Sequence, residues 1–295
     1  MNLTKTAKAF SLLAIVTAIQ VSSLTSDYAH DPSAHTLPAK EWQITGQPSV
    51  AADFIKLEDD IVYLTDSHHQ LLSFNLSEFL ANDQTYILEK TPIFKNVSTH
   101  HDDKYLYVES NGIPSHEMMT GITSWQQQVP IDQDYTNENS WVIPLQPELA
   151  DEPLMGKDNF MKGAIAIAAN GIPIFNPLNN RGEDAKAFGE LDNWGGHSGR
   201  ADDYHYHLAP THLQSQVGAG KPIAYALDGF PVYGETDDEL DEYLGKFNED
   251  GSYEYHATSE FPYLIAGLRG KVTINPDTKA PENEISPQAH THGVR

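Results

Sequence analysis

The sequence predicts a mostly β fold: a hairpin-rich antiparallel β domain with internal repeats and at most one or two short helices. Short apolar runs of strand length recur along the chain, and clusters of turn-forming residues separate them. Asn-Gly or Asp-Gly follows three of these runs, and only residues 237–245 have a good helix pattern. With 295 residues, the chain can bury a substantial core in one large domain or two small ones.

The three Asn-Gly or Asp-Gly turns recur at nearly equal spacing. Each follows an apolar run and is followed by an apolar residue and a proline, and Gly112, Gly171 and Gly229 are 59 and 58 residues apart. Both central residues of such a turn need positive φ, which Asn, Asp and Gly tolerate. The even spacing favours three related units that share one core, with chance recurrence of a common turn as the alternative.

A second repeat involves the histidines. Tyr204-His205-Tyr206-His207 is answered by Tyr253-Glu254-Tyr255-His256, and an acidic, glycine-containing loop precedes each stretch. Side chains alternate between the two faces of a strand, so His205 and His207 project to one face and the tyrosines to the other. The same rule places Glu254 and His256 on one face, which supports a duplication.

Two further elements follow from local patterns. Polar residues between the apolar runs 61–64 and 71–74 predict a hairpin with a polar tip. Residues 237–245 predict a helix, because Thr236 is a suitable N-cap and the final glycine a suitable C-cap.

Composition restricts the class of partner. The net charge is −24, with 42 acidic against 18 basic residues, which excludes nucleic acid and anionic membranes as expected partners. The chain has no cysteine, so disulfides and thiolate metal ligands are excluded, and stability must come from packing or from a metal.

The N-terminus has the pattern of a secretory signal peptide at residues 1–23. Lys5 and Lys8 precede an apolar run that is too short to span a membrane, so we expect export and no membrane span. A flexible lead is expected at residues 24–41, an N-terminal β extension of the same domain at 42–104, and a flexible tail at 273–295.

Several motifs between residues 105 and 272 resemble the YHYH domain, a family found mostly in exported bacterial proteins. The motifs are the tetrapeptide 204–207, Asn111-Gly112-Ile113-Pro114 with His116, Asn170-Gly171-Ile172-Pro173, the stretch from Ala226 to Gly234, and Tyr253-Glu254-Tyr255-His256 followed by Phe261-Pro262-Tyr263. The resemblance implies a YHYH domain at residues 105–272 and a secreted or periplasmic bacterial location, but no particular reaction.

The histidines of these segments are the candidate metal ligands. His205 and His207, at positions i and i+2 of one strand, can present two nitrogens to one ion. His197 lies in a glycine-rich stretch that can bend to bring it alongside, and His116 and His256 fall in the other segments. Five imidazoles buried without a metal would need a hydrogen-bond network for all their ring nitrogens, which is the alternative.

The ligand type restricts the ion. Imidazoles suit zinc, copper, iron or nickel, so we expect a divalent transition metal, zinc or copper, as the cofactor. No nucleotide cofactor is expected, because the chain has no phosphate-binding or dinucleotide fingerprint. Glu117, next to His116, is the candidate catalytic residue as a general base for a metal-bound water. Asp228 could orient a histidine through a hydrogen bond, although its place in a tight turn favours a turn-forming role.

Three functions remain open from the sequence. The first is an exported metal-dependent enzyme, hydrolytic with zinc or oxidative with copper, acting on a small molecule or an extracellular polymer. The second is a non-catalytic module that binds metal, or binds glycans on Trp125, Trp141 and Trp194. The third is a structural cluster of histidines and tyrosines without metal.

Overall fold

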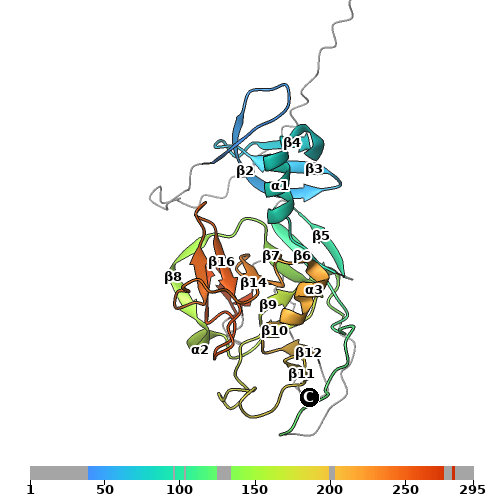
Figure 1. The fold of residues 1–295 in the computed structure, drawn as a ribbon, viewed down its shortest axis with the longest axis vertical. Helices are drawn as coiled ribbons and strands as arrows, with labels where there is room; N and C mark the ends of the chain where they lie inside the picture. Colours follow the sequence, from blue (N-terminus) through green and yellow to red (C-terminus); the bar gives the residue numbers. More distant parts are fainter. Residues whose placement is uncertain are drawn as a thin grey trace, which may run out of the picture. The chain divides into compact units, whose positions relative to one another are not determined.

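The computed structural model describes residues 39–95, 97–102, 104–124, 134–198, 203–275 and 281–282. The predicted signal peptide and nearly all of the predicted lead lie outside these residues, as does most of the predicted tail. Within the described residues the fold is mostly β, as predicted, with antiparallel-rich sheets and few short helices (Figure 1).

The N-terminal part forms a four-stranded antiparallel meander with a helix. The strands pair in the order β1 (Lys40–Trp42), β2 (Val50–Glu58), β3 (Ile61–Thr65) and β4 (Leu71–Asn75). A 3₁₀ turn, η1 (Leu76–Glu78), leads into α1 (Ala81–Lys90). The β3–β4 pairing confirms the hairpin predicted at 61–74.

Smaller sheets follow along the chain. A three-stranded sheet has the order β5 (Ser98–His101), β6 (Tyr105–Glu109) and β7 (Trp141–Pro144). β8 (Leu149–Met155) pairs with β17 (Gly267–Gly270), and β18 (Thr273–Ile274) pairs with β19 (Pro281–Glu282). This last pair lies inside the segment predicted as a flexible tail. Short helical turns are η2 (Asn137–Asn139), α2 (Gly156–Asn159), η3 (Thr211–Leu213) and α3 (Gln214–Val217).

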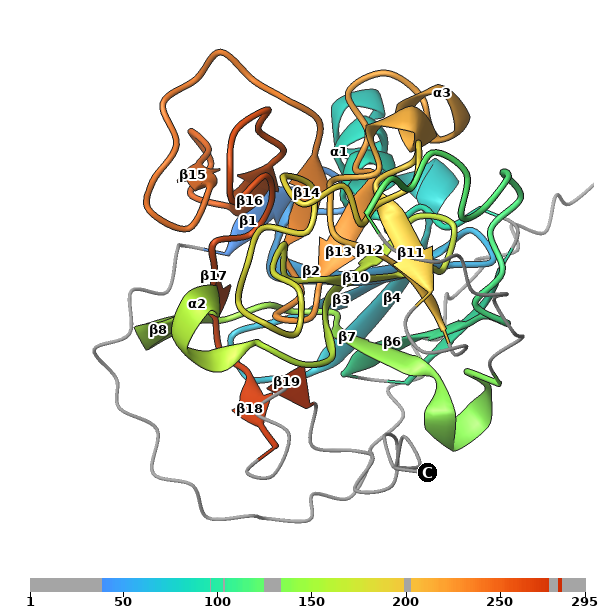
Figure 2. The same ribbon diagram turned by 90° about the horizontal axis from the view of Figure 1, so that it is seen from below.

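An eight-stranded sheet is the centre of the YHYH-like part (Figure 2). Its order is β11 (Gly196–Ser198), β12 (Tyr204–Tyr206), β10 (Pro173–Phe175), β9 (Ala164–Ala168), β13 (Ala224–Ala226), β14 (Pro231–Tyr233), β16 (Tyr253–His256) and β15 (Gly245–Phe247). The pairs are antiparallel except β10 with β12 and β14 with β16, which are parallel.

Both faces of this sheet are buried, which explains the uninterrupted apolar sequence of β9. One face packs against β6 and β7, where Ile167 and Tyr225 meet Val108 and Trp141. The other face packs under irregular segments and contains the buried tyrosines of β12 and β16. The two faces therefore differ in chemistry: tyrosines lie on one and the alternate residues of the same strands lie on the other.

Two of the three predicted Asn-Gly or Asp-Gly hairpins are confirmed. Gly171 joins β9 to β10 and Gly229 joins β13 to β14, with φ of +77° and +96°. Gly112 also has positive φ, +70°, but it follows β6 in a different sheet and leads into an irregular segment.

The predicted helix at 237–245 is wrong. The Asp241 carboxylate accepts the backbone N–H groups of Tyr243 and Gly245 at 2.9 and 3.0 Å, which holds this segment in a turn before β15. Among the described residues the longest helix is α1 instead, in a part predicted to be strand-like; its Asp83 and Ile87, one turn apart, are buried.

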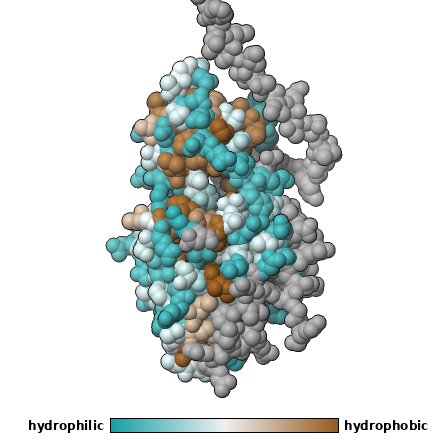
Figure 3. All heavy atoms as spheres, turned by 90° about the vertical axis from the view of Figure 1, so that its right-hand side faces the viewer, coloured by the Kyte–Doolittle hydropathy of each residue, from teal (hydrophilic) through white to brown (hydrophobic). Residues whose placement is uncertain are grey.

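The face seen in Figure 3 is largely hydrophilic, and its hydrophobic residues form separate patches, in keeping with the net charge of −24. No helix within the described ranges is both long and apolar enough to cross a membrane.

Candidate metal centre

Three histidines converge at the end of the eight-stranded sheet. His197 on β11 lies directly opposite His205 on β12, and His207 follows on the same face as His205. The Nε2 atom of His207 lies 3.1 Å from that of His205 and 3.1 Å from that of His197. One ligand atom from each ring lies within 4.8 Å of the others, and we call these three residues the histidine cluster.

Backbone carbonyls fix the orientation of each ring. The Nδ1 atom of His197 contacts the Glu190 carbonyl at 2.9 Å, that of His205 contacts the Asp203 carbonyl at 3.2 Å, and that of His207 contacts the Asn176 carbonyl. A carbonyl oxygen can only accept a hydrogen bond, so each Nδ1 carries the proton and donates it. In the neutral ring, Nε2 then keeps its lone pair, and the Nε2 atom of His207 lies against the Nε2 atoms of both other rings.

The cluster is almost removed from solvent. The three residues are 5–8% exposed. Burial lowers the pKa of His207 well below its ordinary value, and the neighbouring His205 and His197 lower it further. The neutral form of His207, which is the form that binds metals, is therefore favoured at neutral pH.

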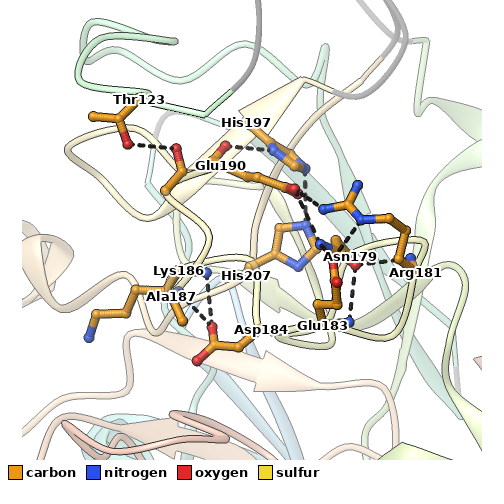
Figure 4. Close-up of polar contacts among 11 residues, drawn as sticks. Thr123, Asn179, Arg181, Glu183, Asp184, Lys186, Ala187, Glu190, His197 and His207 are labelled. Carbon is orange, nitrogen blue, oxygen red and sulfur yellow. Dashed lines mark hydrogen bonds and ion pairs between the residues drawn. The ribbon is translucent and has the colours of Figure 1, made fainter.

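Apolar and charged groups border the cluster. The Phe175 ring stacks on His205 with the ring centroids 4.1 Å apart. Figure 4 shows the Glu190 side chain extending past His197 toward the Arg181 guanidinium, with which it forms an ion pair. A buried carboxylate and its compensating cation thus lie beside the rings.

A hydrogen-bonded frame positions β11 and β12. The buried Asp192 carboxylate accepts the Tyr204 hydroxyl at 2.8 Å and the Gly196 amide at 3.1 Å. A Cβ atom at Gly196 would lie 2.6 Å from both the Tyr204 hydroxyl and the His205 carbonyl, so only glycine fits between the strands here. Tyr204 packs on the face opposite the cluster, as predicted. Its hydroxyl also stabilises the β11–β12 hairpin through the hydrogen bond to Asp192.

His116 lies on that opposite face and not in the cluster. Its Nε2 atom contacts the Tyr206 hydroxyl at 2.6 Å, and its ring stacks on Trp194. His212 also contacts the Tyr206 hydroxyl, at 3.4 Å. Burial, together with the nearby His116, lowers the pKa of His212 to about 4. Glu117 is exposed, and its backbone carbonyl, rather than its carboxylate, contacts the His116 ring.

His256 and Asp228 lie in the other half of the sheet. His256 contacts Glu254 through Nε2 at 3.0 Å, so these two side chains share one face, as alternation predicted. The Asp228 carboxylate accepts the Tyr255 hydroxyl at 2.6 Å and the backbone amides of Gly270 and Phe230 at 2.9 and 3.3 Å. These contacts are those of a turn-forming core residue.

Among the tryptophans considered as glycan platforms, Trp141 is buried and Trp194 is 36% exposed, whereas Trp125 lies outside the described residues.

Sequence reasoning missed Glu190, Arg181 and His212. His212 could have been found, because it follows the tetrapeptide by five residues inside the family-like span. The carbonyl of Asn176 had no sequence pattern to reveal it, because every residue carries a carbonyl and only the fold brings this one to His207.

Comparison with known families matches the part of the chain that contains the cluster. The family model described as YHYH protein matches residues 140–242, a shorter span than the predicted 105–272. Comparisons with curated proteins and with solved structures gave no match. His197, His205 and His207 all lie in the matched span, whereas His116 and His256 lie outside it. The whole histidine cluster therefore lies within residues 140–242, the segment of the chain that matches the YHYH protein family model.

Proposed function

We propose that this protein binds one divalent transition-metal ion, zinc or copper, through the Nε2 atoms of His197, His205 and His207. The observation that carries the proposal is the opposed orientation of the two nitrogens in each ring: the Nδ1 atoms face carbonyls and the Nε2 atoms face each other. Metal-bound histidines characteristically donate their other N–H group to a carbonyl or a carboxylate.

The spacing of the nitrogens fits an ion. With metal–nitrogen distances of about 2.0–2.1 Å and tetrahedral angles, ligand nitrogens lie about 3.3 Å apart. Two of the Nε2 pairs lie 3.1 Å apart, and one ligand atom from each ring lies within 4.8 Å of the others, so the three nitrogens are close enough to share one ion. An all-imidazole donor set is suited to zinc and copper, and the absence of cysteine from the chain leaves no thiolate to compete.

A metal-free hydrogen-bond network explains this geometry less well. Three neutral rings with protonated Nδ1 atoms have no proton to share among their Nε2 atoms. A single proton added to one Nε2 could bridge to a neighbour, but burial opposes the charged form, as the lowered pKa of His207 indicates. A cation at the common point satisfies all three lone pairs at once.

A metal-dependent enzyme is the more specific candidate, and the number of ligands favours it. Catalytic zinc sites commonly have three protein ligands and one open position, whereas structural sites have four protein ligands. A zinc ion bound here would supply a Lewis acid and an activated water, and copper would supply redox chemistry. The chain itself would orient the rings through its three carbonyls and limit the access of water through Phe175. The substrate class proposed is a small molecule or an extracellular polymer.

We also propose that the protein is exported, on the basis of the N-terminal pattern of Lys5, Lys8 and the apolar run that follows them. N-terminal sequencing of the protein recovered outside the cytoplasm should give a start after residue 23. Retention of the full N-terminus in the cytoplasm would refute export without affecting the metal proposal.

Elemental analysis of protein purified without a histidine tag tests the metal proposal. After incubation with zinc or copper and removal of free metal, the wild type should retain one ion per chain. His205→Ala/His207→Ala should retain none. His68→Ala/His69→Ala is the matched control, because it also removes two histidines, both exposed on the β3–β4 turn, and it should retain one ion.

Two results would overturn the proposal. One is a wild type that retains neither zinc nor copper. The other is equal metal content in the wild type and the cluster variant, which would place the ion elsewhere. A site with no exchangeable water on the bound ion would leave metal binding standing and remove the enzyme candidate.

A further inference from the structure

The two halves of the eight-stranded sheet have the same connections. In the first half a hairpin, β9–β10, is followed by a second hairpin, β11–β12, whose last strand pairs in parallel with β10. In the second half β13–β14 is followed by β15–β16, and β16 pairs in parallel with β14. Figure 2 shows the hairpins β11–β12 and β15–β16 at opposite ends of the sheet.

The centre of the sheet has the pairing expected of a two-fold axis. β9 and β13 are antiparallel neighbours, in which Ala166 pairs with Ala226 and Ala168 pairs with Ala224. With the 58-residue offset between Gly171 and Gly229, Ala166 corresponds to Ala224 and Ala168 corresponds to Ala226. A two-fold rotation therefore exchanges the two pairs, as it does at an interface between identical units.

Side-chain hydrogen bonds repeat as well. The Asp192 carboxylate accepts the amides two and four residues further on at 2.9 and 3.1 Å, and the Asp241 carboxylate accepts its corresponding pair at 2.9 and 3.0 Å. The Tyr204 hydroxyl donates to Asp192 at 2.8 Å, and the Tyr253 hydroxyl donates to Asp241 at 3.0 Å. The frame of the histidine cluster therefore has a full counterpart 49 residues later in the chain.

This correspondence assigns a counterpart to each histidine of the cluster. His197 pairs across β11 and β12 with His205, and Lys246 pairs across β15 and β16 with Glu254. The third member of the cluster, His207, corresponds to His256, so this position is a histidine in both halves.

His207 and His256 are held in the same way. The Nδ1 atom of His207 contacts the carbonyl of Asn176, and that of His256 contacts the carbonyl of Gly234 at 2.9 Å, one residue past the end of β10 and of β14 respectively. In the second half, the Nε2 atom of His256 contacts Glu254 at 3.0 Å.

We infer that residues 164–207 and 222–256 are two copies of one unit, and that Lys246, Glu254 and His256 form a second, metal-free version of the histidine cluster. In this version the Lys246 ammonium supplies the positive charge that a bound ion supplies in the first. The comparison with a bound ion rests on the function proposed for the histidine cluster, whereas the copied frame does not.

The contacts of Lys246 support this assignment. Its Nζ atom lies 3.5 Å from the Glu254 carboxylate and 2.6 Å from the Asp238 carboxylate, and the Glu254 and His256 side chains are 15% and 9% exposed. The ammonium pairs with both carboxylates and its positive charge repels a divalent cation, so we expect the copied frame to take no metal.

Replacing the ammonium with an imidazole should restore a metal site. Lys246→His would present the introduced imidazole, Glu254 and His256 as three donors, a set suited to zinc or cobalt. Lys246→Met is the matched control, because it removes the ammonium without adding a donor. Both are made in the wild type and in His205→Ala/His207→Ala, and Zn²⁺ per folded chain is measured by equilibrium dialysis and elemental analysis.

Lys246→His should bind one more zinc ion than Lys246→Met in both backgrounds. A folded Lys246→His variant with the same zinc content as Lys246→Met overturns the inference. If the wild type binds no zinc but Lys246→His binds one, the proposed function fails and the second cluster stands.

If Lys246→His does not fold, the inference is tested by the reciprocal exchange, in which the lysine and glutamate of the second cluster are placed at positions 197 and 205. His197→Lys alone should lower the melting temperature, because it buries an unpaired ammonium. His197→Lys/His205→Glu should recover most of that loss and should not respond to chelators. A double variant no more stable than the single one would show that the two frames are not equivalent.

Discussion

The Nε2 atoms of His197 and His207 lie 3.1 Å apart, although the two residues belong to opposite sides of one hairpin and each donates its Nδ1 proton to a different carbonyl. Two backbone carbonyls, those of Glu190 and Asn176, therefore orient the two rings so that their Nε2 lone pairs lie close together. With His205 on the same face, this arrangement leads to predictions about metal binding and about the frame that supports it, and the buried Asp228 leads to a separate one.

Substitution of any one cluster histidine should reduce zinc affinity more than 100-fold, since loss of a group that merely orients a ligand already costs about 10–100-fold. Competition with a chromogenic chelator measures the affinity. His116→Ala is the comparison variant, because His116 lies on the other face of β12 and should leave the affinity within a few fold. Equal losses for His116→Ala and His197→Ala would contradict a three-histidine site.

Removal of the metal should lower the melting temperature. An ion present at 1,000 times its dissociation constant stabilises the folded state by about 4 kcal/mol. For a domain of this size, that corresponds to about 8–16 °C. Differential scanning calorimetry with and without a chelator measures the shift, and His205→Ala/His207→Ala should show none. A chelator effect of equal size in that variant would place the stabilising ion outside the cluster.

Gly196→Ala should destabilise the protein by about 1–3 kcal/mol, the usual cost of overpacking. The added Cβ would meet the His205 carbonyl and the Tyr204 hydroxyl, each at 2.6 Å, so the strands must separate and zinc affinity should fall as well. Gly234→Ala is the control, because its Cβ would meet only the end of the Gln214 side chain, at 3.2 Å. Chemical unfolding of both variants checks this, and similar stabilities would argue against a tight β11–β12 contact.

The sequence was sufficient for the parts of the site that depend on local geometry. Strand alternation placed His205 and His207 together, and also Glu254 and His256, because the side-chain period of a strand does not depend on the rest of the fold. The turn glycines Gly171 and Gly229 were identified for the same reason, since positive φ is a local requirement.

Contacts set by the tertiary structure could not be predicted in this way. The pattern of the family-like segments suggested His116 as a ligand, but the cluster forms without it, and its ring contacts Tyr206 on the other face of the sheet. The helix predicted at 237–245 failed because Asp241 bonds to the backbone of its own turn and Tyr253 donates to it. These hydrogen bonds depend on the pairing of β16 with β15, which brings Tyr253 to Asp241, so the local sequence of residues 237–245 does not reveal them.

The buried Asp228 should make stability depend on pH in a defined direction. Burial raises its pKa to about 6 from an ordinary value of 3.8. The folded state therefore holds the proton more tightly than the unfolded chain, so this contribution is complete below about pH 4 and is lost as the pH rises through about 6. At 1.36 kcal/mol per pKa unit, the loss is about 3 kcal/mol by pH 7.

Urea unfolding of the wild type and Asp228→Asn between pH 4 and pH 8 measures this contribution. Asparagine does not ionise, so the stability of the wild type relative to the variant should fall across this range and then level off. A difference that does not change with pH would mean that Asp228 ionises in the folded protein as it does in water.

X-ray absorption spectroscopy of the zinc-loaded protein is the sharpest test of the three-histidine site, because it counts the imidazoles on the ion. An ion held by the histidine cluster should show a shell of nitrogen and oxygen atoms at about 2.0–2.1 Å with the outer-shell scattering of three imidazoles, reduced to two in His197→Ala. A shell with one imidazole or none in the wild type, or a spectrum unchanged by that substitution, would contradict a metal held by His197, His205 and His207.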